Sequence, residues 1–165
     1  MRLAPDSIRR VNLAMVAEES DVVFVLTPGG KDTNNLVDEA FLRKMKKTSV
    51  LVNTSRGSVV DSDVLAKALR EGWIWGAGLD VVAGEPKIPA DHPLVREPRC
   101  LFFLSESRKY PRLTIDDLKI RCAILPHIGS ATLETRVDMA ALAVKNALAV
   151  IDGEEMPAGL DLTRL

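Results

Sequence analysis

Four side chains with useful chemistry follow predicted strands of this 165-residue chain: Arg56, Asp80, Glu85 and His127. An arginine offers a planar fork of donors that suits a carboxylate. A histidine exchanges a proton near neutral pH, and a neighbouring carboxylate fixes its tautomer and raises its pKa. An aspartate can orient an amide by accepting its hydrogen bonds. A 2-keto acid needs a cation for its carboxylate, an acid for its carbonyl oxygen and a held hydride donor, so this set suits general acid catalysis on such a substrate.

Three of these residues also have an ordinary structural explanation. Arg56 could be a loop arginine in a salt bridge, His127 a hydrogen-bonded loop residue, and Asp80 the cap of a helix or turn. Glu85 lies past the end of a predicted strand and is a candidate neighbour for the histidine. Spacing along the chain does not decide between these interpretations. They depend on the helices and strands that position the four residues.

The elements alternate along the chain. Unbroken apolar, β-branched runs such as "DVVFVLT" are typical of strands covered on both faces of a parallel sheet. Between them lie amphipathic stretches with capping residues, Asp6 or Ser7 for the first and a clear Asp61 and Gly72 for the third. The predicted strands are 21–27, 49–55, 73–82 and 123–127, and the predicted helices are 6–19, 38–47, 61–72 and 132–153.

Alternation of this kind predicts an α/β fold with a parallel sheet. Ligands of such sheets bind beyond the carboxyl ends of the strands, which is where the four candidate residues fall. Residues 101–121 do not fit the pattern. They lie between two cysteine-containing segments that resemble a duplicated junction, and we expect a surface insertion with a short strand and helix.

Composition excludes several classes of function. The chain is 47% hydrophobic and 27% charged with a net charge of -1, so nothing indicates nucleic acid or an anionic membrane as a partner. No apolar run is long enough to span a bilayer. The two cysteines cannot form a disulfide framework, so we expect a reducing compartment and a cytoplasmic protein.

Other chemical motifs fail on spacing. His92, Cys100, Cys122 and His127 are the residue types that bind zinc, but they match no compact site, and we expect no metal. "GGKDT" at 29–33 lacks the ending of a phosphate loop. "GAG" at 76–78 lies inside a predicted strand and is not a dinucleotide fingerprint.

Longer segments resemble the D-isomer-specific 2-hydroxyacid dehydrogenases, and most closely the glyoxylate/hydroxypyruvate reductases. They are "SDVVFVLTPGGKDTNNLVDEAFLRKMKKTSVLVNTSRGSVVDSDVLAKAL", "GAGLDVVAGEP", "HPL" and "ILPHIGSAT". The resemblance runs from about residue 16 to the C-terminus, except for 101–121. It implies the second half of a Rossmann-type NAD(P)-binding domain followed by a C-terminal helix. The implied reaction is hydride transfer between NAD(P)H and a small 2-keto acid, such as glyoxylate or hydroxypyruvate.

The resemblance also implies roles for individual residues. Arg56 would bind the substrate carboxylate, His127 would donate the proton, and Glu85 would pair with that histidine and raise its pKa. Asp80 would face the nicotinamide carboxamide. The cofactor side would be lined by Thr54, Ser55, Asp80 and Gly129. The matched segments favour neither NAD nor NADP.

The chain also departs from the family pattern. Family members carry a substrate domain and a "GxGxxG" turn before the matched region, and this sequence contains neither. We therefore expect a partial nucleotide-binding domain over 1–153, with the insertion at 101–121, the helix at 132–153 and a tail at 154–165. Little or no turnover is expected from this chain alone. The rival interpretation is a non-catalytic, dinucleotide-related binding or dimerisation module, and in either case we expect a homodimer.

Overall fold

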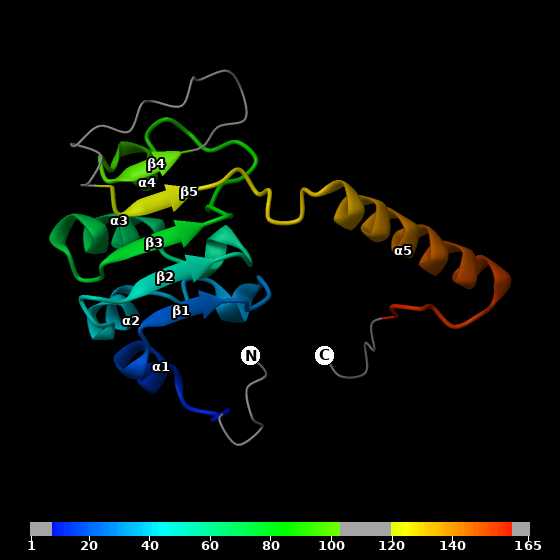
Figure 1. The fold of residues 1–165 in the computed structure, drawn as a ribbon, viewed down its shortest axis with the longest axis horizontal. Coiled ribbons are helices and arrows are strands. Elements are labelled where there is room, and N and C mark those ends of the chain that lie inside the picture. Colours follow the sequence, from blue (N-terminus) through cyan, green and yellow to red (C-terminus); the bar gives the residue numbers. More distant parts are fainter. Residues whose placement is uncertain (1–7, 103–119, 160–165) are drawn as a thin grey trace. The chain divides into compact units, whose positions relative to one another are not determined.

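The computed structural model describes residues 8–102 and 120–159, and the chain divides into two compact units, Met1–His127 and Ile128–Leu165. The first unit is an α/β fold built on one parallel sheet (Figure 1). In the second unit, the described residues 128–159 contain one long helix and the segments that flank it. The predicted α/β class with a parallel sheet is confirmed.

The first unit alternates helices and strands in chain order. Its helices are α1 (Leu13–Glu19), α2 (Glu39–Lys44), α3 (Ser62–Glu71) and α4 (Pro93–Arg96), with short 3-10 turns η2 (Lys31–Thr33) and η3 (Gly57–Val59). Its strands are β1 (Val22–Val25), β2 (Val50–Asn53), β3 (Gly76–Leu79), β4 (Cys100–Phe102) and β5 (Cys122–Ile124).

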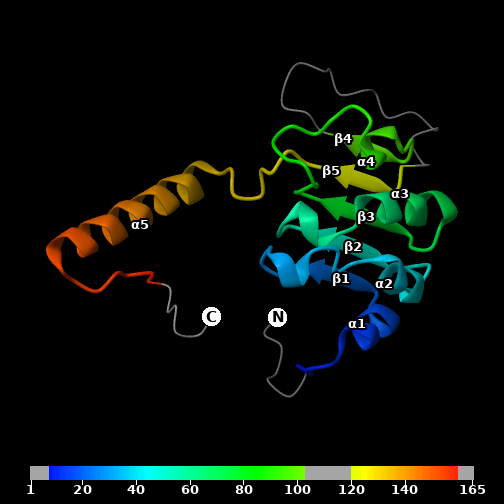
Figure 2. The same ribbon diagram turned by 180° about the vertical axis from the view of Figure 1, so that it is seen from behind.

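The sheet has the order β1-β2-β3-β5-β4, and every neighbouring pair is parallel. Crossover connections between parallel strands are right-handed, and the steps from β1 to β2 and from β2 to β3 advance in the same direction. Their helices α2 and α3 therefore cover the same face of the sheet, as Figures 1 and 2 show. The carboxyl ends of all the strands lie along one edge of the sheet.

The core lies between this helical layer and the sheet. Leu51 of β2 and Leu42, Leu65 and Leu69 of the covering helices are fully buried. Side chains of the opposite sheet face are more exposed, and Phe24 of β1 keeps 63% of its surface accessible. The prediction of strands covered on both faces is thus wrong for β1 within the described residues.

Caps define most of the helix ends. Asp61 accepts a backbone N–H group at the start of α3 and Gly72 ends this helix in the left-handed conformation, as expected. Asp38 caps the start of α2 in the same way. The first helix was predicted too long, because α1 begins only at Leu13, after an Asn12 cap that accepts the Met15 N–H. The alternative caps proposed for it, at residues 6–7, lie outside the described residues.

The region predicted as an insertion contributes to the sheet. Its residues 101 and 102 belong to β4, which pairs with β5 on the side away from β3. Residues 103–119 lie outside the described residues, so the helix expected there is not tested. The short α4, which the sequence pattern did not predict, precedes β4 and begins with Pro93.

The second unit contains α5 (Leu133–Asp152). Thr132 caps its start and Gly153 ends it in the left-handed conformation, so the predicted helix 132–153 is confirmed. Among its described side chains only Ala149 is buried. No helix in the described part of the chain combines the length and the apolar character that crossing a membrane requires.

Candidate active site

The loop after β2, which carries Arg56, is held by a buried asparagine at the end of that strand. Asn53 is 1% exposed and its side-chain amide donates to the Arg56 carbonyl at 2.9 Å. The Asn53 Oδ1 accepts both the backbone N–H and the hydroxyl of Ser55, each at 3.0 Å. One buried side chain therefore satisfies three groups of the following loop and sets its path.

Glycines on both sides leave room for this loop. A Cβ on Gly29, in the loop after β1, would lie 2.9 Å from the Arg56 Cγ. A Cβ on Gly57 would lie only 2.0 Å from the backbone carbonyl carbon of Val82, which follows β3. The loops after β2 and β3 are therefore in direct backbone contact at a position where only glycine fits.

The turn after β5 continues the pairing with β3 beyond the strands. The Leu125 N–H donates to the Leu79 carbonyl at 2.8 Å, and the His127 N–H donates to the Asp80 carbonyl at 2.9 Å. His127 has a φ of 54°, in the left-handed region that non-glycine residues seldom occupy. This conformation is a departure from strand geometry at the residue predicted to do chemistry.

The His127 side chain contacts Glu85. The distance from His127 Nδ1 to Glu85 Oε2 is 3.0 Å, although the two residues are 42 positions apart. The other oxygen of Glu85 accepts the Val82 N–H at 2.7 Å, which orients the carboxylate toward the histidine. The imidazole remains about half exposed and the carboxylate is about one quarter exposed. The histidine is thus held and oriented while its ring stays accessible.

The structure brings most of the predicted residues to one edge of the sheet. Asp80, Glu85 and His127 are joined by the contacts above, and the link from Arg56 to them runs through the Gly57 backbone. The guanidinium itself donates to the Ser55 carbonyl at 2.7 Å. The roles proposed for these residues remain predictions.

The predicted cofactor-side residues differ in their surroundings. Thr54 is exposed, whereas Ser55 is buried with its hydroxyl bonded to Asn53. Asp80 is also buried, at the carboxyl end of β3. Gly129 belongs to the second unit, in a turn closed by the hydrogen bond from the Ala131 N–H to the Ile128 carbonyl.

Two positioning residues, Asn53 and Gly57, were missed by the sequence interpretation. A polar residue at the end of an apolar strand was the available signal for Asn53. For Gly57 the signal was a glycine directly after the candidate arginine.

His92 has a structural role. Its Nδ1 accepts the Leu94 N–H at 3.3 Å and so caps α4. The side chain is buried, and this burial lowers the pKa of His92 below its ordinary value, against weaker opposing effects of the nearby Asp63 and Asp91 carboxylates. A neutral, buried histidine suits a cap that must accept a hydrogen bond.

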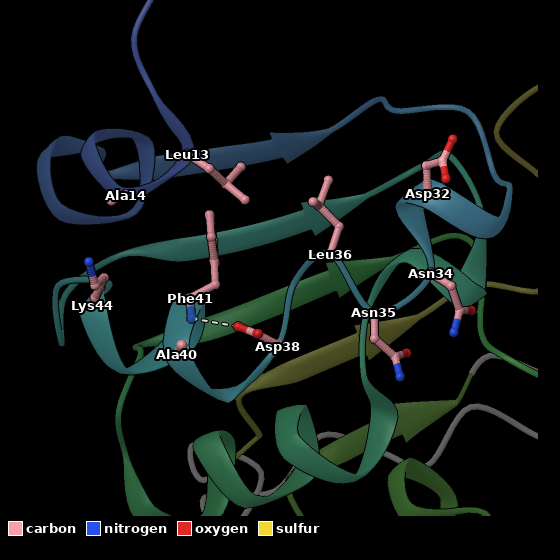
Figure 3. A pocket seen from close by; sticks show the side chains of 10 residues that line it. All are labelled: Leu13, Ala14, Asp32, Asn34, Asn35, Leu36, Asp38, Ala40, Phe41 and Lys44. Carbon is pink, nitrogen blue, oxygen red and sulfur yellow. Dashed lines mark hydrogen bonds between the residues drawn. The ribbon is translucent and has the colours of Figure 1, made fainter.

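A pocket of about 430 Å³ lies elsewhere, among α1, the loop around η2, and α2 (Figure 3). None of the three candidate catalytic residues, Arg56, Glu85 and His127, lines it, and neither does Asp80. Its apolar part is formed by Leu13, Ala14, Leu36, Ala40 and Phe41, and its polar part by Asp32, Asn34, Asn35, Asp38 and Lys44. This pocket is therefore separate from the candidate active site.

Comparison with known proteins identifies the family. Residues 2–103 match the family described as "D-isomer specific 2-hydroxyacid dehydrogenase, NAD binding domain". The chain is 44% identical over 147 residues to a glyoxylate reductase of Thermofilum pendens, covering 89% of this chain and 37% of that protein. It is 41% identical over 152 residues to a glyoxylate reductase/hydroxypyruvate reductase of Mus musculus, covering 92% of this chain and 39% of that protein.

Solved structures of related proteins align with most of this chain. The NADPH-dependent glyoxylate/hydroxypyruvate reductase of Sinorhizobium meliloti, in complex with NADP and malonate, aligns with a TM-score of 0.72 at 29% identity. That alignment covers 97% of this chain and 44% of the other. An NAD-complexed D-isomer specific 2-hydroxyacid dehydrogenase of Lactobacillus delbrueckii aligns with a TM-score of 0.67 at 27% identity, over 92% of this chain and 43% of the other.

The parallel sheet, the residues at its carboxyl edge and these matches together define a nucleotide-binding domain of Rossmann type. The chain belongs to the D-isomer specific 2-hydroxyacid dehydrogenase family, and matches its NAD-binding domain. It spans about two fifths of the length of the curated relatives it matches.

Proposed function

We propose that this chain supplies the carboxylate-binding arginine and the proton donor of an enzyme that reduces a small 2-keto acid with NAD(P)H. Glyoxylate and hydroxypyruvate are the substrates we propose, because the relatives named above are reductases of these acids. The observation that carries the proposal is the 3.0 Å contact between His127 Nδ1 and Glu85 Oε2 at the carboxyl edge of the sheet. It gives an accessible imidazole a fixed orientation.

The ionised Glu85 carboxylate can accept hydrogen bonds but cannot donate them. It therefore selects the form of His127 that carries a proton on Nδ1. The second ring nitrogen, Nε2, is then the atom that presents a proton to the carbonyl oxygen when the ring is doubly protonated. Without Glu85 the ring could rotate and exchange tautomers. Positioning of the proton by this pair is the chain's contribution to the reduction.

Arg56 would bind the carboxylate of the substrate. Its backbone is fixed by Asn53 and by the contact of Gly57 with Val82, so its fork of donors begins from a defined position. Holding the carboxylate and protonating the carbonyl oxygen are separate tasks. They fall on the loop after β2 and the turn after β5, and both of these contact the segment that follows β3.

The residues present suit the nicotinamide end of NAD or NADP. Asp80 puts a buried carboxylate at the end of β3, a chemical type that can accept hydrogen bonds from a carboxamide. Thr54, Ser55 and Gly129 are the other residues proposed for the cofactor side. When bound, the nicotinamide supplies the hydride. Asn53 holds both the backbone N–H and the hydroxyl of Ser55, so Ser55 would shape this side of the site through a fixed loop conformation.

The test combines turnover with binding. Absorbance of NADH and of NADPH is followed with hydroxypyruvate and with glyoxylate, and we expect little or no turnover from this chain. The same acids are titrated into isotope-labelled chain, and we expect saturable NMR shifts at Arg56 and His127. Because the arginine would hold the carboxylate, Arg56→Ala should weaken this binding by about tenfold or more.

An exposed arginine away from the site provides the matched control. Arg96→Ala, in α4, should leave the binding unchanged. Shifts that survive both Arg56→Ala and His127→Ala would contradict the proposed roles and favour a non-catalytic binding module. Robust turnover by this chain would contradict the expected lack of activity. Sedimentation would test the proposed homodimer separately.

A further inference from the structure

The two cysteines of the chain lie side by side in the sheet. Cys100 of β4 and Cys122 of β5 are direct partners in the parallel register. Register partners on neighbouring strands point to the same face, and neighbouring strands lie about 4.8 Å apart. Disulfides join residues whose Cα atoms are about 4.4–6.8 Å apart. The backbone positions therefore suit a bond between these two residues.

The register is fixed by backbone hydrogen bonds at the start of the two strands. The N–H groups of Arg121 and Cys122 both donate to the Arg99 carbonyl, at 2.9 and 3.0 Å. The Cys100 N–H donates to the Glu97 carbonyl at 3.0 Å. The alignment of the two cysteines thus follows from the start of the strand pair.

The two thiols differ in access. Cys122 is 1% exposed, whereas Cys100 is partly exposed. The pKa of the Cys122 thiol is raised, mainly by side-chain hydrogen bonding with Cys100 and to a smaller extent by burial. As register partners of a parallel pair, the two residues project their side chains from neighbouring positions on the same face of the sheet. A small reagent would therefore meet Cys100 first, with Cys122 directly behind it.

We propose that Cys100 and Cys122 form a dithiol site that a small-molecule disulfide, such as oxidised glutathione, converts to an intrachain disulfide. This site is independent of the proposed reductase function, since it uses no residue of the candidate active site.

The chemistry takes two exchange steps. The Cys100 thiolate attacks one sulfur of the reagent, forming a mixed disulfide and releasing the first small thiol. Cys122 then gives up its proton and attacks the Cys100 sulfur, which breaks the mixed disulfide and releases the second small thiol. The protein loses two protons and two electrons, and the reagent gains them as it becomes two molecules of the small thiol. The product joins β4 covalently to β5, the strand that leads to His127.

The experiment treats the folded chain with oxidised glutathione, blocks any remaining thiols by alkylation, and measures the intact mass. We expect a loss of two hydrogens, no alkylation, and a linked pair of peptides containing Cys100 and Cys122. The glutathione adduct should appear transiently and on Cys100. The chain has only two cysteines, so any intrachain disulfide identifies the pair.

Three results would overturn the proposal: a glutathione adduct that persists on Cys100, alkylation of both thiols, or disulfide-linked dimers. Cys122→Ser is the matched control, and should stop at the mixed disulfide. A second measurement needs no oxidant. A trivalent phenylarsenical binds two thiols at once, so it should bind the unmodified chain at least about 100-fold more tightly than Cys100→Ser. Equal affinity for both would also overturn the proposal.

Discussion

The loop after β2 and the turn after β5 reach the same edge of the sheet, but they are held in different ways. The first is fixed from inside by Asn53, a fully buried residue only three positions from Arg56. The second is fixed by residues far along the chain, through the Asp80 carbonyl and the Glu85 carboxylate.

This difference separates two kinds of positioning. The arginine loop depends on the buried Asn53 and on the backbone contact of Gly57 with Val82, so changing these groups should affect folding as a whole. The histidine depends on a partly exposed side-chain pair, so changing its partner should alter orientation with little effect on folding. The predictions for Gly57, Asn53 and Glu85 below test this distinction, and a further prediction concerns the cap of α4.

Gly57→Ala should have the greatest effect. The new Cβ would lie 2.0 Å from the Val82 carbonyl carbon, so the two loops must separate. We expect a loss of about 3 kcal/mol in the free energy of unfolding, at the upper end for overpacking. Urea unfolding measures it. Gly78→Ala is the matched control, since a Cβ there meets nothing within 4 Å. Equal losses for the two variants would show that the contact is not specific.

Asn53→Ala should come next. It leaves the Arg56 carbonyl and the Ser55 donors without their buried partner, at a cost of about 2 kcal/mol. Urea unfolding again provides the measurement. Thr54→Ala, at the exposed neighbouring position, should cost much less. If Thr54→Ala were as costly as Asn53→Ala, the loop would not be held by the asparagine.

A change of pH tests the role of His92, which caps α4 in the connection between β3 and β4. Burial lowers the pKa of His92, so the unfolded chain takes up this proton at a higher pH than the folded chain. The stability from neutral His92 is present above its ordinary pKa of about 6.5 and is lost as the pH falls below that value.

The measurement compares thermal unfolding of the unmodified chain and His92→Asn at pH 7.5 and 5.5. Asparagine can cap α4 without taking up a proton, so the variant should lack this part of the acid sensitivity. The difference should amount to about 1 kcal/mol, the usual value of such a cap. Identical acid sensitivity in both proteins would assign it to other groups.

Glu85→Gln should change stability least, by about 0.5 kcal/mol or less, because the pair with His127 is partly exposed and the amide oxygen can still accept the Val82 N–H. Its effect should appear in the ring of His127. Long-range nitrogen–proton NMR spectra of the neutral ring should show the proton on Nδ1 in the unmodified chain and a shift toward Nε2 in the variant. Glu154→Ala, in the second unit, is the control. An unchanged tautomer would mean that Glu85 does not orient the histidine.

Local signals predicted the helix ends well. Asp61 with Gly72 marked α3, and Gly153 marked the end of α5, because caps act within a few residues. The start of α1 was misplaced because apolar periodicity continued into a segment that is not helical; Ile8 remains 73% exposed. The short α4 escaped prediction, since four residues are too few to show a helical period.

The candidate site was predicted in part. Residue type and strand ends pointed to Arg56, Asp80, Glu85 and His127, because parallel strands bring their carboxyl ends to one edge. The supporting contacts could not be predicted in the same way. Two of these contacts join distant parts of the chain: the fit of Gly57 against Val82, and the register of Cys100 with Cys122. A local sequence pattern cannot predict them.

The backbone contact at Gly57 has a mechanical consequence. With no side chain between them, the segment carrying the guanidinium and the segment carrying Glu85 have no space in which to slide past each other. A ligand that displaces one segment must displace the other as well, and the Glu85–His127 separation would register that displacement. Binding of the substrate carboxylate and delivery of the proton, the roles proposed for Arg56 and His127, would then change together, because the two segments move as one rigid unit.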